Sequence, residues 1–201
     1  MTRTFFNRKA HIWDEDHSER DAAKLREMTE RLGIEPGATL LDVGSGTGVF
    51  LPMLLSKVGK GGRLFALDSA EEMLKRARSK PIQGEVYYLQ ADVSAIPIQS
   101  GVFDVVVCYS SFPHFQDKPG ALSEMNRVTK DGGRLFICHT SSRDQINDVH
   151  SQIPTLEQDV IPDKGDMQRL LRDAGFNEIT IADGEASYLA RARKVCRGKI
   201  R

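Results

Sequence analysis

The sequence has few cysteines and no long apolar segment. Its three cysteines, Cys108, Cys138 and Cys196, form no CxxC pair, which argues against a disulfide framework and against a zinc ribbon. No segment approaches the roughly eighteen apolar residues of a membrane-spanning helix. Residues 1–10 also lack the apolar core of a secretory signal. We therefore expect a soluble, cytoplasmic protein with no part in a membrane.

An excess of charge of either sign is also missing. Lysine plus arginine and aspartate plus glutamate each number 28, so the formal net charge is zero. No strong electrostatic field would then draw the protein to nucleic acid or to an anionic membrane. We expect the partner to be a small molecule, and the protein to be a monomer or a homodimer.

The chain has enough apolar residues for one substantial core. It contains 201 residues, of which 40% are hydrophobic, a size typical of one α/β domain. Glycine and proline recur at intervals that suit alternating strands and helices. The sequence thus predicts a single α/β domain, a Rossmann-like seven-stranded and mostly parallel sheet with helices on both faces and a C-terminal antiparallel hairpin.

Apolar runs and their periodicity predict the elements of this fold. The expected parallel strands lie at 39–43, 63–68, 85–89, 103–108 and 134–138, and the hairpin at 178–182 and 187–195. Helices are expected at 11–32, 48–58, 69–79, 119–129 and 166–174, with Ser69 as the cap of the third. Ligands bind such sheets at the carboxyl ends of the strands, near the topological switch point.

A glycine-rich loop follows the first predicted strand. Gly44, Gly46 and Gly48 alternate with other residues, so the backbone can turn sharply and a ligand can approach it closely. Ordinary strand–helix turns also use glycine. The GxGxG spacing puts Val49 where the dinucleotide fingerprint GxGxxG has its third glycine. Asp42, just before the loop, suits a ligand with an ammonium and a sulfonium group better than a pyrophosphate.

Two further acids follow the next two predicted strands. Asp68 ends the second strand, where a carboxylate can accept hydrogen bonds from a ribose diol. Nicotinamide dinucleotides are bound in the same way. Asp92, just past the third strand, can accept from an adenine amino group, or it can simply form a turn. Together with the loop, these acids favour S-adenosylmethionine over the cofactor of an NAD-type oxidoreductase.

Residues 39–138 resemble the class I S-adenosylmethionine-dependent methyltransferases. The likeness is to the small-molecule, methyltransferase type 11 group that includes the ubiquinone/menaquinone-biosynthesis enzymes. The segments LDVGSGTG, LFALDSAEEML, ADVSAIP, FDVVVCYSSFPHF and GGRLFI carry it, in that order. The sequence departs at Ser100-Gly101-Val102, where relatives often have an acid and a serine before the phenylalanine. That turn lies outside the expected pocket.

The resemblance implies a methyltransferase with S-adenosyl-L-methionine as cofactor and an unidentified, small-molecule acceptor. It divides the domain into a helical lid at 1–35, a cofactor-binding core at 36–141, and acceptor-side helices with the hairpin at 142–201. The cofactor-binding residues that it implies are Asp42, Val43, Gly44, Ser45, Gly46 and Gly48 for the methionine part, Asp68 for the ribose, Ser69 and Met73 for the adenosine edge, Asp92 and Val93 for the adenine, and Tyr109 beside the methyl group.

Chemistry of this kind requires little of the protein beyond positioning. The methyl group is already activated, so its transfer depends on alignment and on exclusion of water. A base is needed only where the acceptor must lose a proton. We therefore assign no catalytic residue and no metal from the sequence.

Three histidines are candidate bases or acceptor contacts. His114 and His139 follow the fourth and fifth strands, and His150 lies further along. Each could instead be an ordinary hydrogen-bonded loop histidine. Residues 139–150 could determine acceptor specificity, or they could form a capped surface helix that begins near Ser142.

Three other groups of residues each allow two interpretations. Cys108 and Cys138 could lie together and take a metal or metalloid acceptor, or they could be small buried hydrophobes. Phe5, Phe6 and Trp13 could close over the cofactor, or they could pack on the domain. The basic C-terminal residues could touch phosphate or RNA, or they could protect an edge strand and a frayed tail: Arg191, Arg193, Lys194, Arg197, Lys199 and Arg201.

Two functional alternatives remain beside the oxidoreductase. One is a cofactor-binding module without catalytic activity, since no catalytic constellation stands out in the sequence. The other is an RNA-directed enzyme, whose binding would depend steeply on salt.

Overall fold

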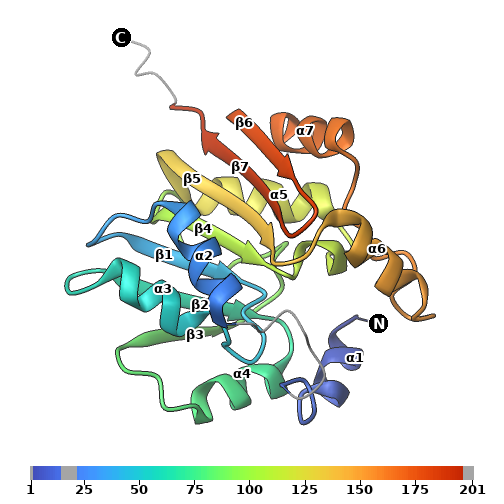
Figure 1. The fold of residues 1–201 in the computed structure, drawn as a ribbon. Coiled ribbons are helices and arrows are strands. Elements are labelled where there is room, and N and C mark those ends of the chain that lie inside the picture. Colours follow the sequence, from blue (N-terminus) through green and yellow to red (C-terminus); the bar gives the residue numbers. More distant parts are fainter. Residues whose placement is uncertain (1, 15–21, 197–201) are drawn as a thin grey trace.

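Seven strands form one sheet in the computed structural model, which describes residues 2–14 and 22–196 (Figure 1). The strand order is β3-β2-β1-β4-β5-β7-β6. The first five strands pair in parallel, and β7 pairs antiparallel with both β5 and β6. The predicted fold is confirmed. The strands are β1 Thr39–Val43, β2 Arg63–Asp68, β3 Val86–Gln90, β4 Phe103–Tyr109, β5 Thr129–His139, β6 Phe176–Asp183 and β7 Tyr188–Lys194.

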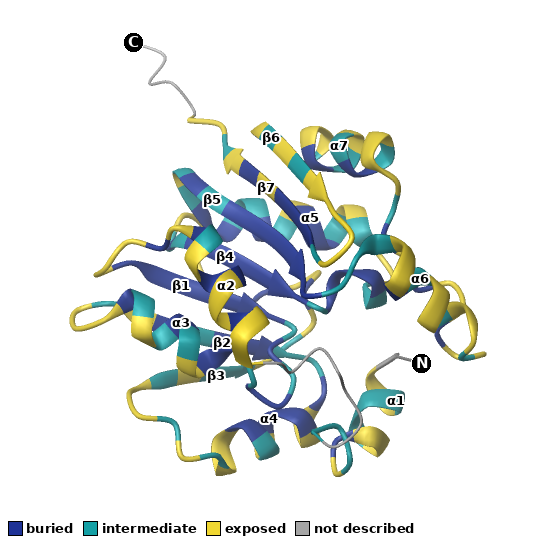
Figure 2. Ribbon diagram, in the orientation of Figure 1, coloured by how far each residue is buried: buried dark blue, intermediate teal, exposed yellow. Residues whose placement is uncertain are grey.

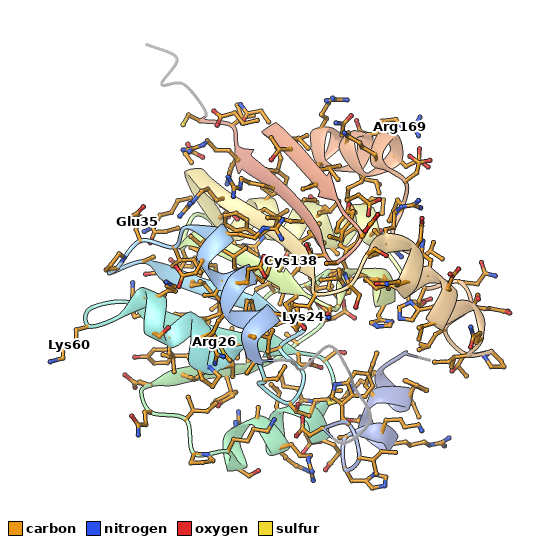
Figure 3. All side chains as sticks on the ribbon, viewed as in Figure 1. Lys24, Arg26, Glu35, Lys60, Cys138 and Arg169 are labelled. Atoms are coloured by element: carbon orange, nitrogen blue, oxygen red, sulfur yellow. The ribbon has the colours of Figure 1, made fainter. Side chains whose placement is uncertain are left out.

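Helices cover both faces of this sheet, so its central strands are buried on both sides (Figure 2). On one face, α5 and α7 pack against a core that includes Leu41 and Val106. On the other, α2 and α3 pack against Leu40, Val105 and Cys138 (Figure 3). The helices are α1 Thr2–Lys9, α2 Ala22–Leu32, α3 Leu51–Val58, α4 Glu71–Ser79, α5 Lys118–Val128, α6 Arg143–Ser151, α7 Lys164–Asp173 and the short 3-10 helix η2 Phe112–His114.

Three predicted helix starts are wrong. The helix expected at 48–58 begins at Leu51. The helix expected from residue 11 begins at Ala22, residues 11–14 form a turn, and residues 15–21 lie outside the described chain. Ser69 does not cap α4: Ala70 holds the N-cap position, and its N–H donates to Asp68 Oδ1 at 2.8 Å. The strand carboxylate thus satisfies a backbone N–H at the helix start, a task that we had expected of the serine.

Strand β5 is longer than the sequence suggested. It begins at Thr129, which pairs with Phe103 across a register shift in β4. Residues 131–133, which the sequence analysis left between the helix at 119–129 and the strand at 134–138, therefore lie inside the strand. Glycine in a strand often marks such an irregularity.

The last strand is not an edge strand, contrary to one of the expectations above. Strand β7 lies between β5 and β6, and its basic side chains are engaged with the fold. The Arg191 guanidinium lies 5.5 Å from the Phe136 ring and donates to Arg31 O at 2.7 Å. Arg193 pairs with Glu178 at 3.0 Å. Lys194 Nζ donates to Thr129 O at 2.7 Å. These contacts explain the charges of β7 without a phosphate or an RNA ligand, and the other three basic residues, at 197, 199 and 201, lie outside the described part.

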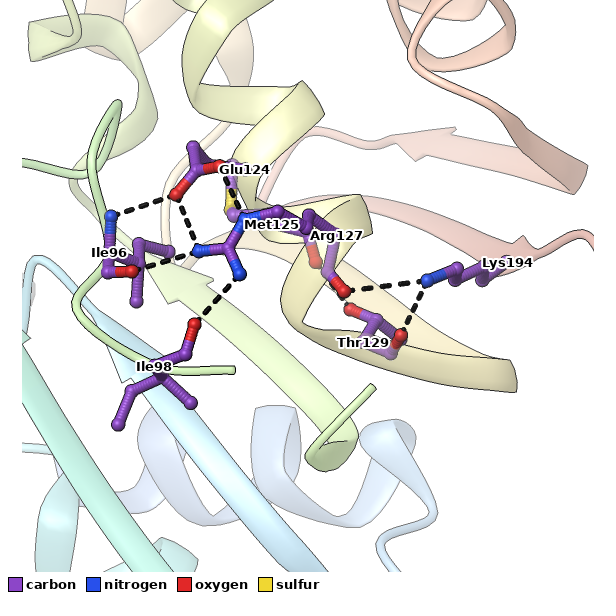
Figure 4. Close-up of polar contacts among 7 residues, drawn as sticks. All are labelled: Ile96, Ile98, Glu124, Met125, Arg127, Thr129 and Lys194. Atoms are coloured by element: carbon purple, nitrogen blue, oxygen red, sulfur yellow. Dashed lines mark hydrogen bonds and ion pairs between the residues drawn. The ribbon is translucent and has the colours of Figure 1, made fainter. Parts of the chain in front are cut away.

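A cluster of polar contacts anchors the loop after β3 (Figure 4). The Arg127 guanidinium of α5 donates to Ile96 O at 2.8 Å and to Ile98 O at 2.7 Å. Glu124 binds the same guanidinium and accepts from Ile96 N at 2.9 Å. The planar fork of arginine suits two carbonyls at once. This cluster fixes the chain just beyond Asp92 and therefore helps to shape the edge of the sheet where ligands bind.

Over residues 2–14 and 22–196, no helix is long and apolar enough to cross a membrane.

Candidate active site

One large cavity, of about 1100 Å³, opens where the parallel strands end. Its walls come from the loops after β1, β2, β3 and β4, from the end of β5, and from α1 and α6. Within the described part of the chain, every predicted cofactor-binding residue except Gly48 lines it, and so do all three predicted histidines. The strand ends thus bring together residues that are up to 108 positions apart in the sequence, from Asp42 to His150.

The glycines of the loop after β1 have different tasks. All three have a positive φ: 70° at Gly44, 55° at Gly46 and 76° at Gly48. A Cβ on Gly44 would lie 2.4 Å from the Ser111 Cβ, so this glycine permits a close approach of two loops. A Cβ on Gly48 would lie 3.1 Å from the Ala77 Cβ of α4. Gly48 therefore permits close packing of the fold and does not face the cavity.

Asp42 is a buried acid that faces the cavity. It is 2% exposed, and its Oδ2 has no hydrogen-bond partner among the described residues. Burial, and then the nearby Asp68, raise its pKa to about 8. An isolated buried carboxyl group is costly to ionise. Asp42 is therefore an acid whose charged form would be stabilised by a cation in the cavity.

Asp68 ties the loop after β1 to the end of β2. Its Oδ2 accepts from Gly46 N and its Oδ1 from Ala70 N, each at 2.8 Å. Burial raises the pKa of this carboxyl group, and backbone N–H groups, first that of Ala70, oppose the rise. Each carboxylate oxygen has a further lone pair, so Asp68 can hold the loop and accept from a ligand at the same time.

Asp92 fits both interpretations offered by the sequence. Its Oδ1 accepts from Ser94 N at 2.8 Å and from Ser94 Oγ at 2.7 Å, so it forms the expected turn. It also lines the cavity beside Val93. A turn residue at this place can still offer its second oxygen, Oδ2, to a ligand.

The three histidines converge where η2, β5 and α6 border the cavity. His114 ends η2, His139 ends β5 and His150 lies on α6, and the His114 and His150 ring centroids are 4.9 Å apart. His139 is 2% exposed, its Nε2 has no partner among the described residues, and burial lowers its pKa to about 3. The imidazoles at this wall offer ring nitrogens for hydrogen bonds.

The sequence did not predict an acid that contacts one of these histidines. Asp159, in the loop between α6 and α7, is 5% exposed, and its Oδ2 lies 2.8 Å from His114 Nδ1. The two residues are 45 positions apart, and no motif joins them. The only local signal is an acid within the mixed segment 156–162, which is too general to predict a contact.

Known proteins resemble this chain in sequence and in fold. A family profile described as "Methyltransferase domain" matches residues 41–137. The chain is 29% identical over 181 residues to the ubiquinone/menaquinone biosynthesis C-methyltransferase UbiE of Shewanella sp. (strain ANA-3), covering 77% of this chain and 72% of that protein. The chain is thus an S-adenosylmethionine-dependent methyltransferase.

A further relative and a solved structure also resemble this chain. The UbiE protein of Teredinibacter turnerae is 35% identical over 116 residues, which cover 56% of this chain and 47% of that one. A crystal structure of a SAM dependent methyltransferase from Aquifex aeolicus superposes with a TM-score of 0.75 at 24% identity, over 94% of this chain and 98% of that one. The methyltransferase fold therefore extends well beyond the matched profile.

The N-terminal segment of this methyltransferase both packs on the domain and lines the cavity. The Phe6 ring lies 5.2 Å from that of Trp13 and 4.9 Å from that of His114. Asp14 accepts from Thr47 Oγ1 at 2.6 Å and pairs with Lys80 at 3.0 Å. The aromatic residues thus pack on the domain, and Phe5, Phe6 and Trp13 also line the cavity; closure over a cofactor stays a prediction.

Helix α6 likewise fits both interpretations of its sequence. Ser142 caps it in a reciprocal pair with Gln145, as the capped-helix alternative requires. Ile146 and His150 of the same helix line the cavity.

The two buried cysteines do not form a joint site. Cys108 pairs in register with Ile137, and Cys138 with Tyr109. Because successive side chains of a strand point to opposite faces, the two thiols lie on opposite sides of the sheet. Burial raises the pKa of Cys108 to about 12. Over the described ranges, no group of three or more ligating side chains could hold a metal ion, and the metalloid hypothesis is wrong for this pair.

Proposed function

We propose that this methyltransferase transfers a methyl group to a small molecule bound between α1, η2 and α6. The observation that carries the proposal is that one cavity joins two chemically different walls. The wall at β1 and β2 contains the acids Asp42 and Asp68, and the wall at η2, β5 and α6 contains three imidazoles. A cationic cofactor and a neutral acceptor would thus meet inside a single chamber.

The residues of the first wall fit S-adenosylmethionine. The unpartnered Oδ2 of Asp42 would accept from the ammonium group, and the open backbone at Gly46 would lie along the methionine chain. Asp68 would accept from the ribose hydroxyls. Ser69, Met73, Asp92 and Val93 would enclose the adenosine, and Tyr109, whose hydroxyl lies 3.0 Å from Thr140 Oγ1, would lie near the methyl group.

The bound cofactor supplies a methyl group on a positively charged sulfur, already activated for displacement. The protein's task is then to align the acceptor and to keep water out. We call the part of the cavity wall at α1, η2 and α6 the acceptor wall. It suits this task because it is largely apolar. Its hydrophobic side chains are those of Phe6, Trp13, Phe115, Ile146, Ile153 and Leu156.

Similar reasoning applies to the class of acceptor, the location and the oligomeric state of the enzyme. An apolar, enclosed wall and a zero net charge support a small acceptor over nucleic acid. We propose a cytoplasmic enzyme, since its three cysteines, all within the described residues, form no disulfide, and we propose that it acts as a monomer or a homodimer.

Cofactor binding should release a proton from Asp42. With a pKa of about 8, the free carboxyl group is mostly protonated at pH 7, and pairing with an ammonium group favours the carboxylate. Titration calorimetry with S-adenosylhomocysteine in phosphate and in Tris should give enthalpies that differ by the heat of transferring close to one proton. Asp42→Asn should remove this dependence on buffer. Equal enthalpies for the unchanged protein in both buffers would contradict the assignment.

Calorimetry and isotope transfer together test the function. We expect micromolar binding of S-adenosylmethionine and S-adenosylhomocysteine and none of NAD. Cofactor labelled in its methyl group, incubated with fractionated cell extract, should deliver label to the low-molecular-weight fraction. Label found only in RNA or protein would refute the small-molecule acceptor, and binding with no transfer to any fraction would favour a module without catalytic activity.

A further inference from the structure

The contact between His114 and Asp159 fixes the protonation of the imidazole. Asp159 Oδ2 lies 2.8 Å from His114 Nδ1, and a carboxylate can only accept, so Nδ1 holds the proton. The other ring nitrogen, Nε2, then has a free lone pair in neutral histidine. It has no hydrogen-bond partner among the described residues, and His114 lines the cavity. A proton acceptor is thus present at the acceptor wall.

The loop of Asp159 is held firmly in place. The Asn147 side chain of α6 binds both backbone groups of Ile161, accepting from its N–H at 2.9 Å and donating to its carbonyl at 3.1 Å. The His150 ring contacts the Asp159 carbonyl oxygen through Nδ1, and Asp159 N donates to Leu156 O at 2.8 Å. The carboxylate therefore has little freedom to leave its partner.

The turn that bears His114 is held as firmly from the other side. Lys118 Nζ donates to Pro113 O at 2.8 Å and to Phe115 O at 3.1 Å, the carbonyls on either side of the histidine. The Phe6 ring of α1 meets the imidazole edge-on. Both members of the pair are thus positioned before any acceptor arrives, which is the usual requirement of a catalytic base.

The charges around His114 favour a neutral ring that can take up a proton. Burial lowers its pKa, the charges of His150 and Lys118 lower it further, and Asp159 raises it in part. His139, at the end of β5, lies close enough to His114 and His150 for their charges to lower its own pKa further. Of the three histidines, His114 alone pairs with a carboxylate in the described part of the chain. Asp159 would stabilise in part an imidazolium formed there.

We propose that His114 is the general base of the reaction and that Asp159 positions it, for an acceptor with a weakly acidic O–H group. The proposal rests on the small-molecule function proposed above. The acceptor oxygen forms a bond to the methyl carbon, and the carbon–sulfur bond breaks with its electron pair remaining on sulfur. The O–H proton moves to His114 Nε2. The positive charge thus passes from the sulfonium to the imidazolium beside Asp159.

A series of substituted phenols, from fully ionised to fully protonated at the assay pH, tests the role of His114. His114→Gln should slow methylation of the protonated phenols about a hundredfold and leave that of the ionised phenols within about twofold, since these need no base. His11→Gln, an exposed histidine outside the cavity, is the matched control and should match the unchanged protein. An equal loss on every phenol would overturn the proposal.

The pH dependence of kcat/KM tests the positioning role of Asp159. Asp159→Asn removes the charge that raises the pKa of His114, so the acidic limb should move to lower pH and the maximal rate should fall about tenfold. Asp148→Asn, on the exposed side of α6, is the control and should leave the limb in place. Affinity for S-adenosylhomocysteine should be unchanged in both. If the acidic limb of the pH profile did not move in Asp159→Asn, the proposed pairing of His114 with Asp159 would be contradicted.

A measurement that needs no turnover separates the two proposals. In ¹⁵N NMR of the complex with S-adenosylhomocysteine, His114 should carry its proton on Nδ1 at neutral pH, and Asp159→Asn should lower its titration midpoint. If the enzyme binds the cofactor but methylates no small molecule, the proposed function fails, while this result still decides the pair. A proton on Nε2 of His114 would overturn the proposed pairing of His114 with Asp159.

Discussion

Asp68→Ala is expected to weaken the binding of S-adenosylmethionine about a hundredfold. Two hydrogen bonds from a ribose diol to a carboxylate contribute together about 3 kcal/mol, and each 1.4 kcal/mol or so is a factor of ten. The same change removes the acceptors of Gly46 N and Ala70 N, so the loop after β1 loses its tie to β2. Titration calorimetry with the purified variant measures the effect.

Asp104→Ala provides the matched control. Asp104 also lies on a strand of the sheet and accepts from a backbone N–H, that of Thr39 at 2.9 Å, but it does not line the cavity. Its loss should lower the stability of the fold without changing the affinity for the cofactor. If Asp68→Ala bound the cofactor as tightly as this control does, the ribose contact would have to be abandoned.

Gly44→Ala should lower the free energy of unfolding by about 3 kcal/mol. A non-glycine residue at a φ of 70° costs roughly 1–2 kcal/mol, and the new methyl group would collide with the buried Ser111 side chain at 2.4 Å. Ser111 donates to Val43 O at 2.7 Å, so the collision also disturbs the end of β1. Denaturant unfolding of the variant gives the number directly.

Gly46→Ala isolates the backbone part of this effect. Its φ is 55°, and in the described structure nothing lies within 4 Å of the added Cβ, so only the roughly 1–2 kcal/mol of backbone strain should appear. Adding Ser111→Gly to Gly44→Ala removes the obstructing side chain and should recover part of the loss. If Gly44→Ala and Gly46→Ala lowered the free energy of unfolding equally, the contact with Ser111 would contribute nothing to the loss.

The core of the fold could be predicted because its signals are local. Strands β1 and β2 match their predicted limits, since short apolar runs bounded by glycine or acids leave little choice of register. The start of β5 could not be predicted in the same way. Thr129 joins the sheet through a register shift opposite Phe103, and the glycines that follow indicate a turn just as well as a bulge.

The two walls of the active site differ in how far they could be predicted. The cofactor wall is encoded in consecutive loops after strands, so each residue lies next to the strand that places it. The acceptor wall depends on tertiary contacts. His114 could be named from its place after β4, but its partner Asp159 could not, because only the packing of the loop after α6 brings the carboxylate to the imidazole.

The bond between Asn147 and Ile161 has a consequence for how such an enzyme changes its acceptor. It closes residues 147–161 into a loop fastened to its own preceding helix, whereas the cofactor wall is built from residues 42–109. We therefore expect that the stretch of chain between β5 and α7 can be exchanged as one unit. Such an exchange would change the acceptor side of the shared cavity and leave the cofactor-binding residues in place.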